Sequence, residues 1–250
     1  MKKKLWKVWI VLILAVTMFM LYCFAGCGIY TKEEEWGNFT VAFYKGRTTA
    51  YITGLTAVGQ QQRFIVIPKE IDGAKVVSLG KRTALWEPAL REWCSDSVEK
   101  IYVVSMLKMI SGTFDNCPNL LKALSIYGGA AINVPHYTEV YFSNYVYLTI
   151  NPTQLDDWGR ANVSYFYNYD IEENYGYYWI DDWDYGSKIE FIPPEPEREG
   201  YTFGGWYKEP ECINKWDFET DVLPEERTEI NEDGEEEVVY QETKLYAKWL

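Results

Sequence analysis

The sequence is poor in histidine and has no excess of basic residues. Its 250 residues include one histidine, His136, which leaves no second imidazole for a histidine-based metal site. Only 24 basic side chains stand against 37 acidic ones, for a formal net charge of −13. A nucleic-acid-binding surface needs basic groups to displace counterions. We therefore expect no nucleic-acid partner, no metal site and no cofactor.

Cysteine is also scarce. Of the five cysteines, two lie within the first 27 residues, and the remaining three are Cys94, Cys117 and Cys212. A disulfide framework would require a dense, even set, so at most one bridge is possible among these three. We expect them to be small buried side chains rather than nucleophiles.

Aromatic residues, by contrast, are abundant. They make up 17% of the chain, with 11 Trp, 21 Tyr and 11 Phe. A disordered acidic chain would have few of them, and aromatic side chains are enriched in β-strands. The composition therefore predicts a mainly β fold with minor α, in one or two domains large enough to bury a core.

Residues 1–26 have the pattern of an export signal. Four lysines precede a charge-free stretch over residues 8–21, and Phe24-Ala25-Gly26-Cys27 follows. The segment resembles a bacterial lipoprotein signal peptide, which implies cleavage before Cys27 and a diacylglycerol on its sulfur. Two acyl chains would anchor the chain stably. The alternative is an uncleaved transmembrane helix over residues 8–26, near the roughly 20 residues that span a bilayer.

Either reading places the rest of the chain on the extracytoplasmic face of the cell membrane. The four lysines of the signal leave with it, so the part beyond residue 26 carries 20 basic and 37 acidic side chains.

Residues 27–58 are expected to form a polar tether and a β-hairpin around Lys45-Gly46-Arg47. Asp72-Gly73 is a further turn signal. The strands predicted around these two turns are 39–44, 49–53, 64–67 and 76–79.

Residues 59–160 contain an internal repeat. Cys94–Val103 overlays Cys117–Ile126 at a separation of 23 residues, which would place Ile101 beside Leu124 and Val103 beside Ile126. This period falls in the roughly 20–29-residue range of leucine-rich repeats. Each such unit contributes one strand whose apolar face is covered by its neighbour.

The phrases Ile67–Gly73, Val76–Gly80 and Ile110–Cys117 resemble the BspA-like leucine-rich repeat family. The resemblance covers roughly residues 50–127 and implies a short stack of surface-displayed interaction modules. Within this region the sequence predicts a helix over residues 84–92 and a third strand ending near Leu148.

Residues 161–250 are expected to form a second unit. Gly200–Tyr207 together with Leu245–Trp249 resembles the internalin-type B-repeat, a small β-grasp-like domain of bacterial surface proteins. Gly204-Gly205 predicts a bulge or a close backbone approach. The acidic run over residues 225–242 is expected to be a solvated loop, and whether it binds cations stays open. The strands predicted for this unit are 163–167, 188–192, 199–207, 216–218 and 245–249.

Two features could carry chemistry. Adjacent carboxylates in Asp181-Asp182-Trp183-Asp184 suggest a glycosidase, but such an enzyme needs two carboxyls across a cleft, and an acidic aromatic surface loop is the simpler interpretation. We therefore assign no catalytic residue. Tyr175, Trp179 and Trp183 are a candidate ligand-binding face, because amphipathic aromatic side chains are preferred anchors.

Together these features predict a membrane-anchored surface lipoprotein that acts as a non-catalytic binding, adhesion or scaffold module. The ligand, protein or glycan, is not named by the sequence. The alternative is a polysaccharide-binding accessory protein or a glycan-active enzyme of the cell envelope. A third possibility is a structural spacer without a ligand.

Overall fold

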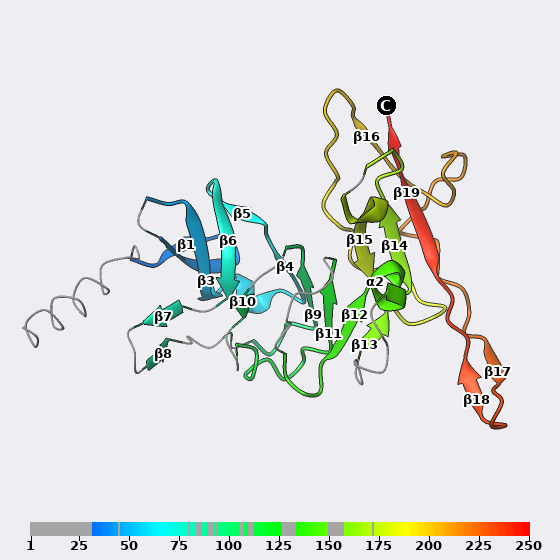
Figure 1. The fold of residues 1–250 in the computed structure, drawn as a ribbon, viewed down its shortest axis with the longest axis horizontal. Coiled ribbons are helices and arrows are strands. Elements are labelled where there is room, and N and C mark those ends of the chain that lie inside the picture. Colours follow the sequence, from blue (N-terminus) through cyan, green and yellow to red (C-terminus); the bar gives the residue numbers. More distant parts are fainter. Residues whose placement is uncertain are drawn as a thin grey trace, which may run out of the picture.

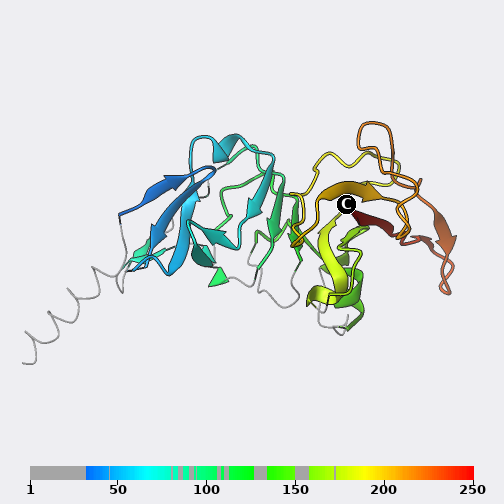
Figure 2. The same ribbon diagram turned by 90° about the horizontal axis from the view of Figure 1, so that it is seen from above.

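The computed structural model describes residues 32–44, 46–79, 81–83, 87–89, 93, 95–105, 108–109, 113–126, 134–149, 158–171 and 173–250. The fold is mainly β, as predicted. Three sheets follow one another along the long axis of the molecule (Figures 1 and 2). Cys27 and the alternative helix over residues 8–26 lie outside the described residues.

The first sheet contains the predicted hairpin. β2 (Phe39–Phe43) and β3 (Thr49–Leu55) pair antiparallel, and β6 (Ala74–Leu79) adds to β3 in parallel. β5 (Glu70–Ile71) pairs back onto β6 through Asp72-Gly73, whose φ angles of 51° and 71° are those of a tight hairpin turn. β1 (Glu34–Trp36) and β10 (Lys108–Met109) complete the sheet. The strands predicted over 39–44, 49–53 and 76–79 and the turn at Asp72-Gly73 are confirmed, whereas Lys45 lies outside the described residues. The predicted polar tether was wrong over Glu34–Trp36, which form β1.

The second sheet is a stack of five parallel strands. Its order is β13 (Trp158–Arg160), β12 (Glu139–Phe142), β11 (Lys122–Ser125), β9 (Lys100–Val103) and β4 (Phe64–Ile67). The predicted pairing register was wrong by one residue, because Ile101 lies beside Ala123 and Val103 beside Ser125, a separation of 22 residues. Successive side chains of a strand project from opposite faces, so this slip moves Leu124 to the other side of the sheet.

Both faces of the parallel sheet are covered. Ile65, Ile101 and Ala123 pack into one core with the first sheet. Tyr102 and Leu124, from the opposite face, pack into a second core with the C-terminal sheet. Parallel sheets are usually buried on both sides, and here the parallel sheet is the middle layer that joins the two ends of the chain.

The C-terminal sheet has four strands in the order β15 (Tyr177–Asp181), β14 (Val163–Phe166), β19 (Thr243–Trp249) and β16 (Phe203–Tyr207). Strands β14, β16 and β19 confirm three predicted strands. The strands predicted over 188–192 and 216–218 were wrong, since both segments are irregular. β15 was not predicted. The predicted bulge is present between Phe203 and Trp206, where Gly205 has a φ of 107° and the Lys215 side chain lies over it.

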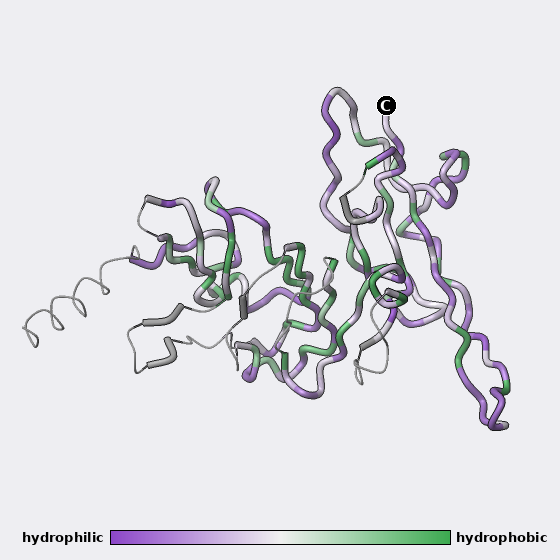
Figure 3. Tube along the Cα trace, in the orientation of Figure 1, coloured by the Kyte–Doolittle hydropathy of each residue, from purple (hydrophilic) through white to green (hydrophobic). Residues whose placement is uncertain are grey.

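The acidic run is not a loop. β17 (Thr228–Ile230) and β18 (Glu236–Val238) form a two-stranded hairpin that projects from the C-terminal sheet (Figure 1). All six of its strand residues are exposed, and the hairpin is largely hydrophilic (Figure 3). The prediction that the segment is solvated is thus confirmed, although its backbone is ordered as strands.

Helical structure is limited in the described residues. The elements are η1 (Gly59–Gln61), α2 (Asn144–Thr149) and η3 (Glu173–Gly176), and the remaining short strands are β7 (Lys81–Thr83) and β8 (Glu87–Ala89). β8 occupies the centre of the helix predicted over 84–92, and Leu148 lies in α2 rather than at the end of a strand; both predictions were wrong. Across the described ranges, no helix has the length and apolar character needed to cross a membrane.

Candidate functional site

Two lysines stand side by side on the parallel sheet where it meets the C-terminal sheet. Lys100 begins β9 and Lys122 begins β11, and the two residues are register partners. Like charges on neighbouring strands repel each other, so this arrangement needs negative charge nearby.

Asp181 and Asp182, at the end of β15, supply that charge. Lys100 Nζ lies 3.0 Å from Asp181 Oδ1, and Lys122 Nζ lies 2.7 Å from Asp182 Oδ2. Lys100 also donates to the Asp182 carbonyl at 2.6 Å, and the Tyr102 hydroxyl donates to Asp181 Oδ2 at 2.9 Å. The two sheets are therefore joined by a network of charged hydrogen bonds.

The network is shielded from solvent. The Asp181 side chain is 0% exposed and that of Lys100 only 7%. Burial raises the pKa of the Asp181 carboxyl, although Lys100 and Tyr102 act in the opposite direction. Burial also lowers the pKa of Lys100, against the effect of Asp181. The free-energy cost of removing two charges from water is thus similar in size to the attraction between them. The main effect of the pair is to disfavour alternative packings of the two sheets in which either charge would be left unpaired.

Trp183 closes the network from one side. Lys100 Nζ lies 3.1 Å from the centroid of the Trp183 ring, a cation–π contact. The turn that carries Trp183 is held by Asn162, which donates to the Trp183 carbonyl at 2.6 Å and accepts from its backbone N–H at 3.1 Å.

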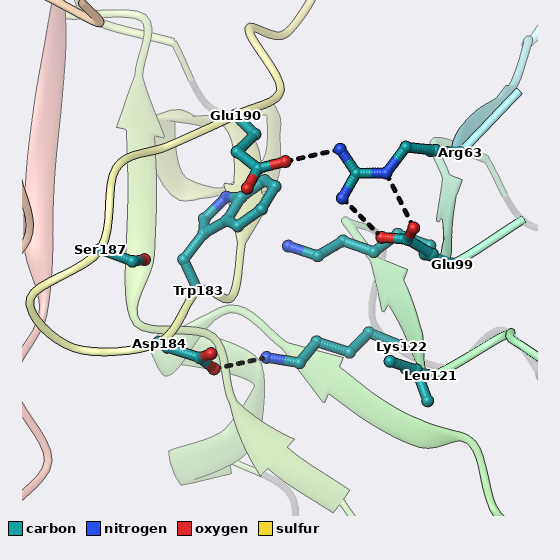
Figure 4. Close-up of a pocket in the computed structure, with 9 residues that line it drawn as sticks. Arg63, Glu99, Leu121, Lys122, Trp183, Asp184, Ser187 and Glu190 are labelled. Atoms are coloured by element: carbon teal, nitrogen blue, oxygen red, sulfur yellow. Dashed lines mark hydrogen bonds and ion pairs between the residues drawn. The ribbon is translucent and has the colours of Figure 1, made fainter.

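A cavity of about 230 Å³, lined mostly by charged residues, opens beside the Lys100–Asp181 and Lys122–Asp182 pairs (Figure 4). At its rim Arg63, near the start of β4, bonds Glu99 through two nitrogens at 2.8 Å each and Glu190 at 2.7 Å. Lys122 faces Asp184 at 3.9 Å. Arg63 thus bonds Glu99 of its own sheet and Glu190 of the C-terminal unit, and Lys122 faces Asp184 of that unit, so these charges help to fix the two units to each other. The lining residues are Arg63, Glu99, Lys100, Leu121, Lys122, Trp183, Asp184, Ser187 and Glu190.

The interpretation of Asp181–Asp184 as a surface loop was wrong. Asp181 belongs to β15, and Asp181, Asp182 and Trp183 are buried at the junction. The carboxylates of Asp181 and Asp182 form ion pairs with lysines and are not solvated. Of the four residues, only Asp184 is largely exposed, at 94% of its side chain.

The candidate ligand face is not a common surface. Trp179 and Trp183 are 3% and 9% exposed, because both pack between the parallel sheet and the C-terminal sheet. Tyr175 is 65% exposed and stacks on Tyr145 of α2 at a centroid distance of 3.7 Å. Ligand binding by Tyr175 stays a prediction.

The other singled-out residues are placed as follows. Cys117 is buried and its Sγ donates to the Trp93 carbonyl, which confirms a packing role for this side chain. Cys212 is half-buried. His136 is exposed. Cys27 and Cys94 lie outside the described residues.

Sequence reasoning missed Lys100 and Lys122. The available signal was the phrase Lys100-Ile101-Tyr102 overlaid on Lys122-Ala123-Leu124, which places the lysines in register only at a period of 22 residues. The 23-residue overlay concealed it.

Residues 168–248 match the Listeria-Bacteroides repeat domain, a surface repeat family. The matched segment is about a third of the chain and contains β15, β16, the β17–β18 hairpin and all of β19 but its last residue.

Two proteins of Evansella cellulosilytica are similar to part of the chain. One, named "Putative membrane protein", is 41% identical over 66 residues, which are 26% of this chain and 7% of that protein. The other, named "Putative Gly-rich membrane protein", is 36% identical over 66 residues, 26% of this chain and 6% of that protein. The chain thus spans less than a tenth of the length of these relatives. No solved structure matches it.

Proposed function

We propose that the chain is a membrane-anchored surface lipoprotein that displays a non-catalytic binding or scaffold module outside the cytoplasm. The match of residues 168–248 to a surface repeat family carries the proposal. The names of the two relatives, which place them in membranes, support it.

The proposal includes the two finer resemblances. The parallel stack would be a short BspA-like leucine-rich repeat region, and the C-terminal sheet an internalin-type B-repeat. The leucine-rich repeat assignment is supported by the parallel sheet, in which each successive segment of the chain adds one strand and both faces of the sheet are covered. The order of β16 and β19 at the two ends of the matched segment supports the second.

The non-catalytic part rests on the buried junction. Asp181 and Asp182 are already bonded to Lys100 and Lys122. A glycosidase would need two carboxyls facing a substrate across a cleft. This pairing favours a structural role for the two carboxylates over an acid–base role.

Metabolic labelling with palmitate tests the anchor. The wild-type chain should incorporate the label, and Cys27→Ala should abolish it. Cys23→Ala is the matched control, because Cys23 lies four residues earlier in the same segment and should leave labelling unchanged. An unlabelled, uncleaved chain in the membrane fraction would instead support the transmembrane helix over residues 8–26.

Trypsin treatment of intact cells tests the exposure. Arg227 lies at the base of the projecting hairpin with 62% of its side chain exposed. Cleavage after Arg227 without lysis is expected, and protection until the cells are broken would contradict a surface location. A pull-down from envelope extracts with the full chain then separates a binding module from a spacer.

A further inference from the structure

The buried pair of Lys100 and Asp181 places an amine directly against a carboxyl group. Lys100 Nζ lies 3.0 Å from Asp181 Oδ1, and the two side chains are 7% and 0% exposed. The residues belong to different sheets and lie 81 positions apart in the sequence, so folding brings them together. An amine and a carboxyl group are the two reactants of an amide bond, and holding reactants in contact replaces a bimolecular encounter.

Both carboxyl oxygens of Asp181 accept hydrogen bonds from fixed donors. The backbone N–H of Asp182 donates to Oδ1 at 2.8 Å, and the Tyr102 hydroxyl donates to Oδ2 at 2.9 Å. The Tyr102 ring is itself held in place, because it stacks on Phe191 at a centroid distance of 4.6 Å. Donors in these positions stabilise the negative charge that develops on oxygen when a nucleophile adds to a carboxyl carbon.

The Lys100 amine is held as well. It donates a proton to the Asp182 carbonyl at 2.6 Å, and its Nζ lies 3.1 Å from the centroid of the Trp183 ring. Lys100, Asp181 and Tyr102 are all buried, so little water reaches the reacting groups. Exclusion of water favours condensation, which releases water, over the reverse hydrolysis.

The surroundings of the pair favour the neutral forms that react. Burial raises the pKa of the Asp181 carboxyl and lowers the pKa of the Lys100 ammonium. The charge of Lys122 lowers the pKa of Lys100 further, whereas the attraction between Lys100 and Asp181 opposes these shifts. Transfer of one proton within the pair gives an amine and a carboxylic acid, a state that burial makes less unfavourable than it is in water. The ion pair is the starting state, and chains keep it until the slower condensation takes place.

We propose that Lys100 and Asp181 condense in the folded chain to form an intramolecular isopeptide bond. The Nζ lone pair attacks Cγ of the protonated carboxyl, a C–N bond forms, and the bond between Cγ and Oδ2 breaks. Oδ2 leaves as water with its own proton and one proton from Nζ, so no oxidant, reductant or further reactant is needed. The amide product retains one N–H to donate to the Asp182 carbonyl, and Oδ1 to accept from the Asp182 N–H.

The second ion pair of the junction is not expected to react. Lys122 Nζ lies 2.7 Å from Asp182 Oδ2, but the two side chains keep 17% and 11% of their surface exposed. Solvent in the adjoining cavity can reach the Lys122 ammonium, whereas that of Lys100 lies under the Trp183 ring. Burial thus distinguishes the pair that condenses from the pair that stays ionic.

The bond would join the parallel sheet to the C-terminal sheet covalently. It replaces two buried charges by a neutral amide, which removes the cost of keeping those charges away from water. It also closes a loop between residues 81 positions apart, and such closure stabilises a fold by restricting the unfolded chain, as a disulfide does. The condensation needs only the folded chain, so this inference stands independently of the proposed function.

Intact-mass spectrometry of the full-length protein in detergent tests the proposal. During incubation at neutral pH, the folded protein should accumulate a species that is lighter by one water. The same incubation in urea should not produce this species from chains of full mass, because the two groups are no longer held together. Trypsin should then release residues 92–108 joined to residues 161–188, since trypsin does not cleave after a modified Lys100.

Variants assign the reacting groups. Lys100→Arg retains the positive charge but has no amine that can be deprotonated, so it should keep its full mass. Tyr102→Phe should slow the loss of water about tenfold or more, because one of the two donors to the carboxyl is removed. Lys122→Arg changes the register partner of Lys100, and as the matched control it should lose water as the wild type does. Unfolding curves show whether each variant is folded.

Three results would overturn the assignment: an unchanged mass of the folded wild type, loss of water from Lys100→Arg at the wild-type rate, or a tryptic map in which the water is lost within a single peptide. The last result would indicate a succinimide, for example at Asp72-Gly73 or Asp233-Gly234. None of these results bears on the proposed function, because lipid labelling and the trypsin treatment of intact cells do not depend on the bond.

Discussion

The ammonium group of Lys100 lies 3.0 Å from the carboxylate of Asp181, a residue 81 positions further along the chain, and both side chains are almost completely buried. The pair connects the middle sheet to the C-terminal sheet. Burying such an ion pair costs desolvation free energy, and leaving one of the two charges buried without its partner costs more.

The first prediction concerns removal of one partner. Lys100→Met should lower the free energy of unfolding by about 3–5 kcal/mol, because the buried Asp181 carboxyl would lose its counter-ion and would either stay charged without a partner or take up a proton. The double variant Lys100→Met/Asp181→Leu should recover most of the loss, since no buried charge is then unpaired. Urea unfolding of the purified protein measures both.

The exposed pair of Arg63 and Glu99 provides the control for that prediction. Arg63 is 51% exposed, and exposed ion pairs contribute roughly 0–1 kcal/mol. Arg63→Met should therefore have a small effect. An equal loss for Arg63→Met and Lys100→Met would show that burial does not govern the energetics of the junction.

The second prediction is a pH dependence with a defined sign. Hydrogen bonds from Arg63 lower the pKa of Glu99 below its ordinary value. The stabilisation from Glu99 is thus present above its unfolded-state pKa and is lost as the pH falls through the lowered folded-state pKa.

Glu99→Gln should accordingly lose less stability than the wild type on acidification from neutral pH to about pH 3, on either side of the ordinary Glu pKa. Urea unfolding at the two pH values gives the comparison. Asp181 acts in the opposite direction, because its raised pKa favours folding below its unfolded-state pKa and that contribution is lost as the pH rises. Identical acid sensitivity of Glu99→Gln and wild type would contradict the prediction.

The third prediction tests the 22-residue register. Val103 and Ser125 are register partners, whereas Val103 and Ile126 would be partners at 23 residues. The variant Val103→Cys/Ser125→Cys should form a disulfide on oxidation, since neighbouring strands bring the two Cα atoms to about 4.8 Å.

Val103→Cys/Ile126→Cys is the matched pair and should stay reduced, because its side chains project from opposite faces. Peptide mapping by mass spectrometry distinguishes the two cross-links. A cross-link in the 103/126 variant alone would contradict the 22-residue register and support the 23-residue one.

The fourth prediction concerns the exposed hairpin. Replacing residues 227–239 by a short Gly-Ser linker should change the free energy of unfolding by no more than about 0.5 kcal/mol, since surface changes without buried contacts are near neutral. The strand residues of β17 and β18 are all exposed. A large drop in Tm on thermal unfolding would reveal a contact that burial does not indicate.

Local patterns in the sequence predicted much of the fold. The β2–β3 hairpin and strands β4, β6, β14, β16 and β19 follow from β-branched and aromatic runs next to turn residues. These signals depend only on residues that are close together in the sequence, so they can be recognised without knowing which strand pairs with which.

The site was much harder to predict. Asp181 and Asp182 look like solvated loop residues because acidic side chains are rarely buried unless they are paired, and their partners are 60 or more positions away. Trp179 and Trp183 look like residues of a ligand-binding surface because amphipathic aromatic side chains are preferred anchors, and the sequence does not say which sheet covers them. The register error arose because Leu124 and Ala123 are both apolar, so the pattern alone fits either face.

The middle position of the parallel sheet has a mechanical consequence. The first sheet, the parallel sheet and the C-terminal sheet are connected in series (Figure 2). A pull applied to the C-terminal sheet therefore reaches the first sheet through the parallel sheet. The junction that carries this load contains the Lys100–Asp181 and Lys122–Asp182 pairs and the packed side chains of Tyr102 and Leu124. Resistance of the protein to tension, a property set by the rate of unfolding rather than by equilibrium stability, would then depend on this junction.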